Sequence, residues 1–148
     1  MTRGQIAIIK KEYGKNTILT SVEFNGDMYM PTKSWVGHGQ QVINALRKVN
    51  DTAAYQLAVA RFNYNYHHYN DCDSLTHTEN IEALDFTKDY FDNWFSDYIY
   101  IKNITLETVK LITSIIDEEG RDIGKKEVDL APNQIAVICF GRLVKVTQ

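Results

Sequence analysis

The chain has 148 residues, of which 44% are hydrophobic and 24% are charged, and this composition excludes an intrinsically disordered chain. The net charge of −3 is uneven: residues 1–50 carry seven Lys or Arg against three Asp or Glu, residues 51–100 carry two against nine, and the remainder carry seven of each. The acidic middle would repel phosphate, which argues against a nucleic-acid groove there, with imitation of nucleic acid towards a basic partner protein as the alternative. The length predicts a single domain over residues 1–148.

The first residues have the pattern of a β-hairpin. Gln5–Glu12 and Lys15–Phe24 are both rich in β-branched residues, and the second of them alternates apolar and polar side chains. Tyr13-Gly14 separates the two segments. We therefore predict two antiparallel strands with their turn at Gly14.

A glycine-containing bend is expected to lead from this hairpin into the first helix. Asn25-Gly26-Asp27 indicates a tight turn, after which we expect a short strand over Asp27–Met30. Gly37, His38 and Gly39 then allow a sharp bend into a helix over Gln40–Val49. Such a helix start has unpaired N–H groups that can bind an anion or a carbonyl, so these three residues are candidate ligand-binding residues, with close packing as the alternative.

A second helix is predicted from Asn50-Asp51-Thr52, which offers several N-cap residues, to about His68. Its apolar and aromatic residues recur at steps of four and three, as expected for a core-facing side, with a stacking platform for rings as the alternative. The polar segment Asn70–Thr78 is interpreted as a loop.

Potential metal ligands gather at the end of that helix. His67, His68, Cys72 and His77 place three of the four histidines and a thiol within eleven residues. Their spacing matches no established zinc motif, so the sequence assigns no metal or other cofactor, and these four residues are kept as an alternative metal site.

Residues 79–98 combine acidic and aromatic side chains. They contain six carboxylates, with Lys88 as their single basic residue. The spacing of the apolar residues from 81 to 95 is approximately helical, and on a helix Asp85, Asp89 and Asp92 would lie together. The alternatives are an ordinary solvated face and an acidic surface for a protein partner, with aromatic anchors at Tyr90, Trp94 and Tyr98.

The C-terminal part is expected to be mostly β-structure. Alternation over Asp97–Ile104 predicts a strand, and Thr108–Ile116 is predicted to pair with it, with a short helix as the alternative. Turns are expected at 117–122 and 130–133. Ile135–Phe140 indicates a buried strand, and the basic tail after Gly141 an edge strand.

The opening Thr2-Arg3-Gly4-Gln5-Ile6, followed by Asn25-Gly26-Asp27-Met28-Tyr29 and then Gly37-x-Gly39, resembles a family of short uncharacterised proteins from phages, prophages and bacterial genomes. Those proteins begin with a Thr-Arg-x-x-Ile strand and carry an Asp-Gly-Tyr-Pro turn before a Gly-x-Gly helix start. The resemblance covers about the first third of the chain, and Met28 stands where the family has the turn glycine. It implies a shared hairpin-and-helix unit and no chemistry.

Two arrangements could support hydrolysis. If Met1 were removed, Thr2 would become an N-terminal nucleophile with its own α-amine as the base, and the bend at Gly37–Gly39 could supply oxyanion donors. His38 is the second catalytic candidate. Both are alternatives, because the supporting residues cannot be identified from spacing.

We therefore expect an α+β domain in which an antiparallel sheet, formed by the N-terminal hairpin and the C-terminal strands, is covered by two or three central helices. The expected function is that of a binding or accessory protein that contacts a protein partner through residues 79–98. Cys72 and Cys139 form no disulfide framework, and the sequence contains no secretory or membrane segment, which favours the cytoplasm.

Overall fold

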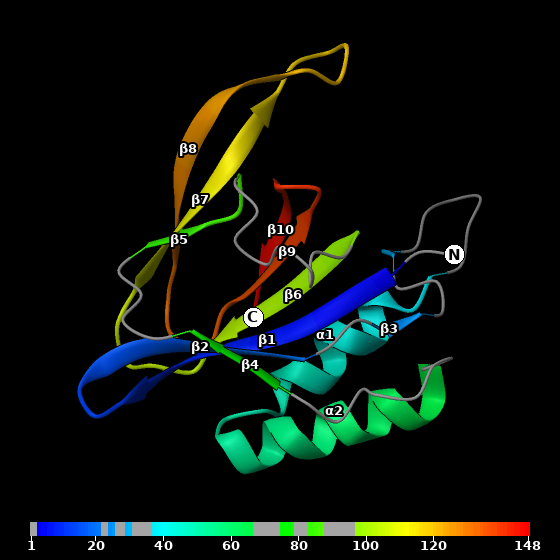
Figure 1. Ribbon diagram of the computed structural model, residues 1–148, viewed down its shortest axis with the longest axis vertical. Helices are drawn as coiled ribbons and strands as arrows, with labels where there is room; N and C mark the ends of the chain where they lie inside the picture. The colour runs from blue at the N-terminus through cyan, green and yellow to red at the C-terminus, as the bar shows by residue number, and fades with distance from the viewer. Residues whose placement is uncertain are drawn as a thin grey trace.

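The computed structural model describes residues 3–21, 24–25, 29–30, 37–66, 75–78, 83–87 and 97–148. Within them the chain forms two helices and ten strands (Figure 1). The helices are α1 (Gly39–Arg47) and α2 (Thr52–Tyr66). The strands are β1 (Arg3–Glu12), β2 (Lys15–Ser21), β3 (Phe24–Asn25), β4 (Leu75–Thr78), β5 (Ala83–Asp85), β6 (Tyr98–Asn103), β7 (Val109–Ile116), β8 (Asp122–Leu130), β9 (Ile135–Cys139) and β10 (Arg142–Thr147).

The larger sheet joins the N-terminal hairpin to the C-terminal strands. Its order is β10-β9-β6-β1-β2-β4, with β3 paired to β1 at one end. All of its strand pairs are antiparallel except β1 and β6, which run parallel. This confirms the α+β class, while the parallel pair at the centre of the sheet was not predicted.

Two hairpins of this sheet have the same kind of turn. Glu12 lies opposite Lys15, so the β1–β2 loop consists only of Tyr13 and Gly14, with φ angles of 54° and 76°. The β9–β10 loop likewise consists of two residues, Phe140 and Gly141, with φ angles of 48° and 81°. Two-residue loops with positive φ at both positions match the twist of the strands that they connect, which confirms the predicted turn at Gly14.

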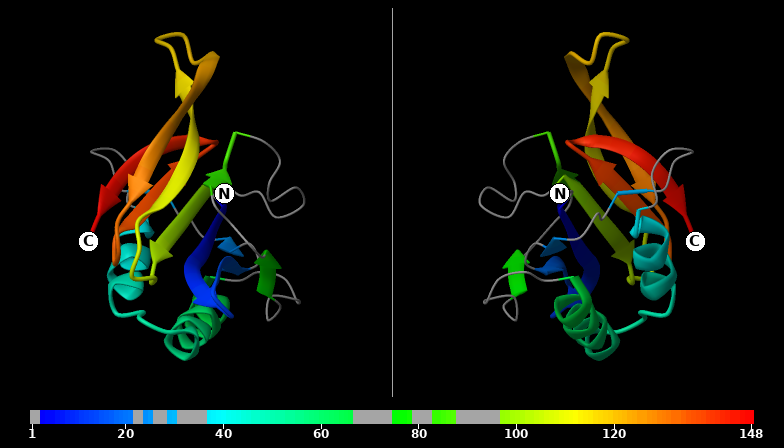
Figure 2. Two further views of the ribbon diagram at one scale, coloured as in Figure 1. Left: turned by 90° about the vertical axis from the view of Figure 1, so that its left-hand side faces the viewer. Right: turned by 90° about the vertical axis from the view of Figure 1, so that its right-hand side faces the viewer.

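Both helices lie on one face of the larger sheet (Figure 2). The α2 N-terminus is capped by Asp51, whose Oδ1 accepts a hydrogen bond from the Ala54 N–H at 2.7 Å, as the sequence indicated. Tyr55 is fully buried and donates from its hydroxyl to the Ile6 C=O at 2.7 Å, which fixes α2 to β1. Burial of these apolar faces is the main stabilising term for the helix layer.

A second, smaller sheet with the order β5-β7-β8 covers the opposite face. Its apolar residues, among them Leu84, Leu111 and Leu130, pack against Ile9 and Ile101 of the larger sheet. Beyond this contact the β7–β8 ribbon continues away from the helices and ends in an exposed turn (Figure 1). The fold therefore has three layers and one projecting element.

Two expectations about this ribbon were wrong. β7 pairs with β8 and β5 rather than with β6, because both edges of β6 are already hydrogen-bonded, to β1 and to β9. β8 was not predicted as a strand. Most of its side chains are exposed, so its sequence lacks the alternation that burial of one face would impose.

Three local predictions were also wrong. Residues 83–85 are a strand rather than part of a helix, because Leu84 and Phe86 are buried on either side of Asp85 with the period of a strand. Residues 75–78, interpreted as loop, form the edge strand β4 next to β2. Residues 29–30 are not in a strand, since the Tyr29 C=O accepts from the Gly39 N–H.

Candidate functional site

The solvent-facing side of the small sheet carries alternating charges, and we call it the charged face: Asp85, Lys110, Lys125, Glu127 and Asp129. Strand register places these residues on one side, since Asp85 lies opposite Ile112 in β7, and Ile112 lies opposite Glu127 in β8. Lys125 Nζ lies 3.5 Å from Asp85 Oδ2, and Lys110 Nζ lies 3.3 Å from Glu127 Oε2. On the charged face one ion pair thus joins β8 to β5, and the other joins β7 to β8.

Asp85 joins the acidic segment to this face. Its Oδ1 accepts hydrogen bonds from the Thr87 N–H at 2.9 Å and the Thr87 hydroxyl at 2.5 Å. Partial burial acts to raise the pKa of Asp85, but the Thr87 hydrogen bonds and the charge of Lys125 outweigh it and lower that pKa. The predicted partner-binding residue Asp85 is therefore held as a carboxylate by groups of its own chain.

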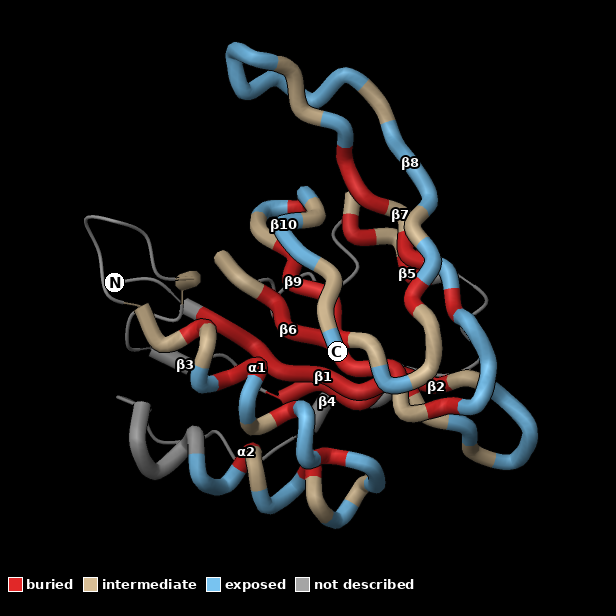
Figure 3. Tube along the Cα trace, turned by 180° about the vertical axis from the view of Figure 1, so that it is seen from behind, coloured by how far each residue is buried: buried red, intermediate tan, exposed pale blue. Residues whose placement is uncertain are grey.

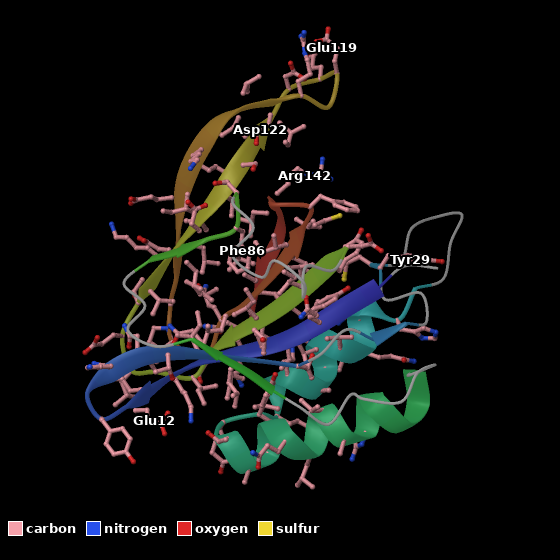
Figure 4. All side chains as sticks on the ribbon, viewed as in Figure 1. Glu12, Tyr29, Phe86, Glu119, Asp122 and Arg142 are labelled. Atoms are coloured by element: carbon pink, nitrogen blue, oxygen red, sulfur yellow. The ribbon has the colours of Figure 1, made fainter. Side chains whose placement is uncertain are left out.

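The tip of the β7–β8 ribbon is acidic and exposed. Asp117 Oδ1 accepts from the N–H groups of Glu119 and Arg121, both at 2.9 Å, and the Arg121 side chain forms ion pairs with both carboxylates. Figure 4 shows Glu119 at the outer end of the ribbon and Asp122 nearer its base. Ile123 is 62% exposed beside these charges. The tip combines fixed acidic groups with an accessible apolar side chain.

Tyr98, the predicted anchor nearest β6, is half-buried. Its ring stacks on that of Tyr100, with a centroid distance of 6.1 Å, and it lies opposite Cys139 in the β6–β9 pair. Burial and the neighbouring Cys139 thiol raise its pKa. The other predicted contacts, Asp89, Tyr90, Asp92 and Trp94, lie outside the described residues, so their partner-binding role stays a prediction.

The glycines of the bend before α1 are explained by packing. A Cβ on Gly37 would lie 2.0 Å from the Tyr29 carbonyl oxygen, and one on Gly39 would lie 2.3 Å from the Tyr100 hydroxyl. The Gly39 N–H donates to Tyr29 at 3.0 Å. Ligand binding at this bend stays a prediction, and the bend's Gly39 N–H already has an acceptor.

His38, the catalytic alternative, precedes α1. Its C=O accepts hydrogen bonds from the N–H groups of Gln41 and Val42, and its Nδ1 lies 3.2 Å from Gln41 Oε1. It therefore lies at the start of α1 without capping the helix by its side chain. Thr2 lies outside the described residues, so the nucleophile hypothesis stays a prediction.

The histidine cluster is only partly described. His77 belongs to β4, where it lies opposite Leu19 of β2, whereas His67, His68 and Cys72 fall outside the described ranges. Among the residues that the structure describes, no three His, Cys, Asp or Glu side chains gather in a way that could hold a metal ion. The four-residue metal site remains an untested prediction.

Sequence reasoning missed a buried polar network where β6 ends. Lys102 is only 4% exposed, and its Nζ donates to the C=O groups of Arg47 at 3.1 Å and Val49 at 2.7 Å. Asn103 is fully buried, and its side chain organises the loop over residues 104–107. The sequence signal was the pair of adjacent polar residues at the end of an otherwise apolar strand.

A pocket of about 440 Å³ adjoins this network at the carboxyl ends of the parallel strands β1 and β6. Its charged side chains already contact partners, since Lys11 pairs with Glu107 at 2.5 Å and Lys10 with Glu12 at 3.4 Å. Its lining residues are Lys10, Lys11, Asn50, Asp51, Thr52, Ile104, Thr105, Leu106 and Glu107. Nothing in their arrangement selects one chemical class of ligand.

Comparison with known proteins gives no family and no structural relative. No protein-family model matches the chain, and neither the curated proteins nor the solved structures contain a match. In the described part of the chain, no helix is long and apolar enough to span a lipid bilayer. Function must therefore be argued from the residues themselves.

Proposed function

We propose that this protein binds a protein partner with a basic contact surface, through residues 79–98 beside the small sheet. The observation that carries the proposal is strand β5, which lies within this segment and is paired with β7 in parallel. The pairing attaches Ala83–Asp85, a described part of this segment, to β7 of the projecting ribbon. A rigid attachment lowers the entropic cost of presenting the segment to a partner.

The charge distribution supports a basic partner. Residues 51–100 carry nine acidic against two basic residues, and six of the acidic ones fall within residues 79–98. Charges of one sign steer a partner of the opposite sign and raise the association rate, and the effect weakens with added salt. We place the encounter in the cytoplasm, since Cys72 and Cys139 provide no disulfide framework for an oxidising compartment.

The test is quantitative capture of host proteins by immobilised protein and its variants. We expect Asp89→Lys with Asp92→Lys to reduce capture of a salt-sensitive partner by about tenfold or more. A matched control is Glu118→Lys with Asp122→Lys at the ribbon tip, which changes the net charge equally and should retain capture. Asp85 is left unchanged because its contacts with Thr87 and Lys125 support β5.

The anchors are tested separately, by Tyr90→Ala and Trp94→Ala in the same capture assay. Truncation of an aromatic hot-spot residue costs about 2 kcal/mol or more of binding free energy, or roughly thirtyfold in affinity. If both the lysine pair and the aromatic truncations left capture equal to that of the tip control, residues 79–98 would not be the contact surface.

A further inference from the structure

The outer edge of β8 is the longest strand edge of the small sheet, and the hydrogen bonds of its neighbour β7 determine how that edge is arranged. The Ile112 C=O accepts from the Phe86 N–H at 2.9 Å, and the Ser114 N–H donates to the Gly141 C=O at 2.8 Å. Both groups lie on the side of β7 that faces β5. Because backbone groups alternate in direction along a β-strand, the neighbouring residues Leu111 and Thr113 direct their N–H and C=O groups toward β8.

The register transfers this alternation to β8. Lys126 lies opposite Thr113 of β7, and Val128 lies opposite Leu111. The backbone groups of Lys126 and Val128 therefore form hydrogen bonds with β7. Lys125, Glu127 and Asp129 direct their N–H and C=O groups to the outer edge. No described strand lies on that side, and these three residues are exposed. Most of β8 has the colour of exposed residues in Figure 3. A long exposed edge of this kind is a template for strand addition.

The charges along this edge complement themselves. If a second copy of β8 lies antiparallel with a two-fold axis at Glu127, Lys125 of each copy lies opposite Asp129 of the other. The two Glu127 carboxylates then face each other, but each already has a Lys110 ammonium at 3.3 Å. In each copy the charges of Lys110 and Lys125 balance those of Glu127 and Asp129, so the paired edges are electrically neutral and continue the alternating charges of the charged face.

The other side of the ribbon is compatible with this register. It places Lys126 opposite Val128 of the second copy and Gly124 opposite Leu130, so no like charges meet there. Moving the axis by one residue, to Lys126, would bring the two Lys126 side chains together. The bulge that interrupts the β7–β8 register lies between Ile115 and Ile116, toward the tip and away from Lys125–Asp129.

We propose that the β8 edge pairs with the β8 edge of a second copy of this chain, which joins the two small sheets into one continuous sheet. The partner-binding proposal concerns the other edge of the same sheet, so either can fail without the other. The free energy of association comes mainly from backbone hydrogen bonds along a short edge, and we expect a dissociation constant of roughly micromolar order.

The first experiment is sedimentation velocity over roughly 1 µM to 1 mM protein, a range that spans the expected dissociation constant. In a dimer of Lys125→Glu, residues 125 and 129 are both acidic at each of the two contacts, and in a dimer of Asp129→Lys both are basic. Each variant should therefore weaken the dimer by about tenfold or more. An equimolar mixture of these two variants should form a heterodimer, because each substituted residue then faces an opposite charge. Lys126→Glu is the control, since it adds the same charge change opposite Val128.

The second experiment separates edge pairing from side-chain charge. Glu127→Pro removes an N–H group that β7 does not use, so it should abolish the dimer while the thermal unfolding of the monomer stays nearly unchanged. The inference is overturned if the wild type is monomeric throughout the range, or if the mixture of charge variants stays monomeric. Persistence of the dimer in Glu127→Pro would place the contact elsewhere and would equally overturn it.

Discussion

Asn103 is the residue whose removal should reveal how the two sheets are held together. It is fully buried at the end of β6, and its Oδ1 accepts from the Thr105 N–H at 2.9 Å and the Thr105 hydroxyl at 2.7 Å. Its Nδ2 donates to the C=O groups of Glu107 at 2.8 Å and Leu130 at 3.0 Å. One side chain therefore links β6, the loop that leads to β7, and the end of β8.

The size of the effect follows from these four hydrogen bonds. A buried hydrogen bond contributes about 1 kcal/mol, and a buried group left without a partner costs about 1–3 kcal/mol. Without Asn103 Oδ1 as an acceptor, the single Thr105 hydroxyl hydrogen can go to the Glu107 C=O, 2.9 Å away, whereas the buried Thr105 N–H loses its acceptor. We therefore expect Asn103→Ala to lower the free energy of unfolding by about 2–4 kcal/mol.

Urea unfolding followed by circular dichroism measures this loss, with the m-value as a check that the folded state stays compact. Asn16→Ala is the matched control, because Asn16 Oδ1 has no hydrogen-bond partner among the described residues, and we expect a loss of less than about 1 kcal/mol. Hydrogen exchange should rise at residues 104–107 in Asn103→Ala only. Equal losses in the two variants would refute the role of Asn103 as a link between the sheets.

Three further predictions concern individual contacts. Lys102→Met should cost about 1–3 kcal/mol through the lost hydrogen bonds to the C-terminus of α1. Burial lowers the pKa of Lys102 below 10.5, the value in the unfolded chain. The free energy of unfolding of the wild type should therefore rise as pH increases from the lowered pKa toward 10.5. Unfolding measured as a function of pH should show no such rise in the methionine variant. Gly39→Ala should lower the melting temperature because its Cβ would lie 2.3 Å from the Tyr100 hydroxyl, and adding Tyr100→Phe should restore part of the loss. The lowered pKa of Asp85 predicts that wild type exceeds Asp85→Asn in stability above about pH 4 and that the difference disappears as pH falls through that lowered pKa.

Local chemistry made much of the first third predictable. The Tyr13-Gly14 turn was predicted, and the cap of α2 is Asp51, one of the three candidates that the sequence offered; both signals lie within a few residues. β4 and β5 were missed because they are short and lie at sheet edges. Their assignment depends on which neighbours are available, and a sequence window of their length contains no such information.

The parallel pairing of β1 with β6 shows a different limit. Both strands are buried on both faces, and Gly4 of β1 lies opposite Tyr98 of β6, almost a hundred residues later. An apolar strand in this position has the same composition whether its neighbour runs parallel or antiparallel. The direction of β6 relative to β1 depends on the whole connection between them, from β2 to β5, whose path a pattern of apolar residues does not specify.

Lys102 explains why the polar network could not be predicted. In the alternation of Tyr98, Tyr100 and Lys102 with isoleucines, a lysine indicates a solvent-facing position. Here that face is covered by α1, and the ammonium group satisfies carbonyls that the helix cannot bond itself.

Lys102 looks exposed in the sequence but is buried, whereas the charged residues of β8 are exposed as the sequence suggests and differ only in what their backbone groups can do. Lys125, Glu127 and Asp129 look like ordinary surface charges in the sequence, and they acquire a possible role only through the direction of their backbone groups along β8. Direction and register arise from the pairing of β7 with β5 and β8, so they appear only in three dimensions. Both the acidic segment and the β8 edge depend on that single strand. A change that displaced β7 would therefore affect partner binding and self-association together. Asp129→Lys separates the two better than Lys125→Glu, because Lys125 also forms an ion pair with Asp85 of β5.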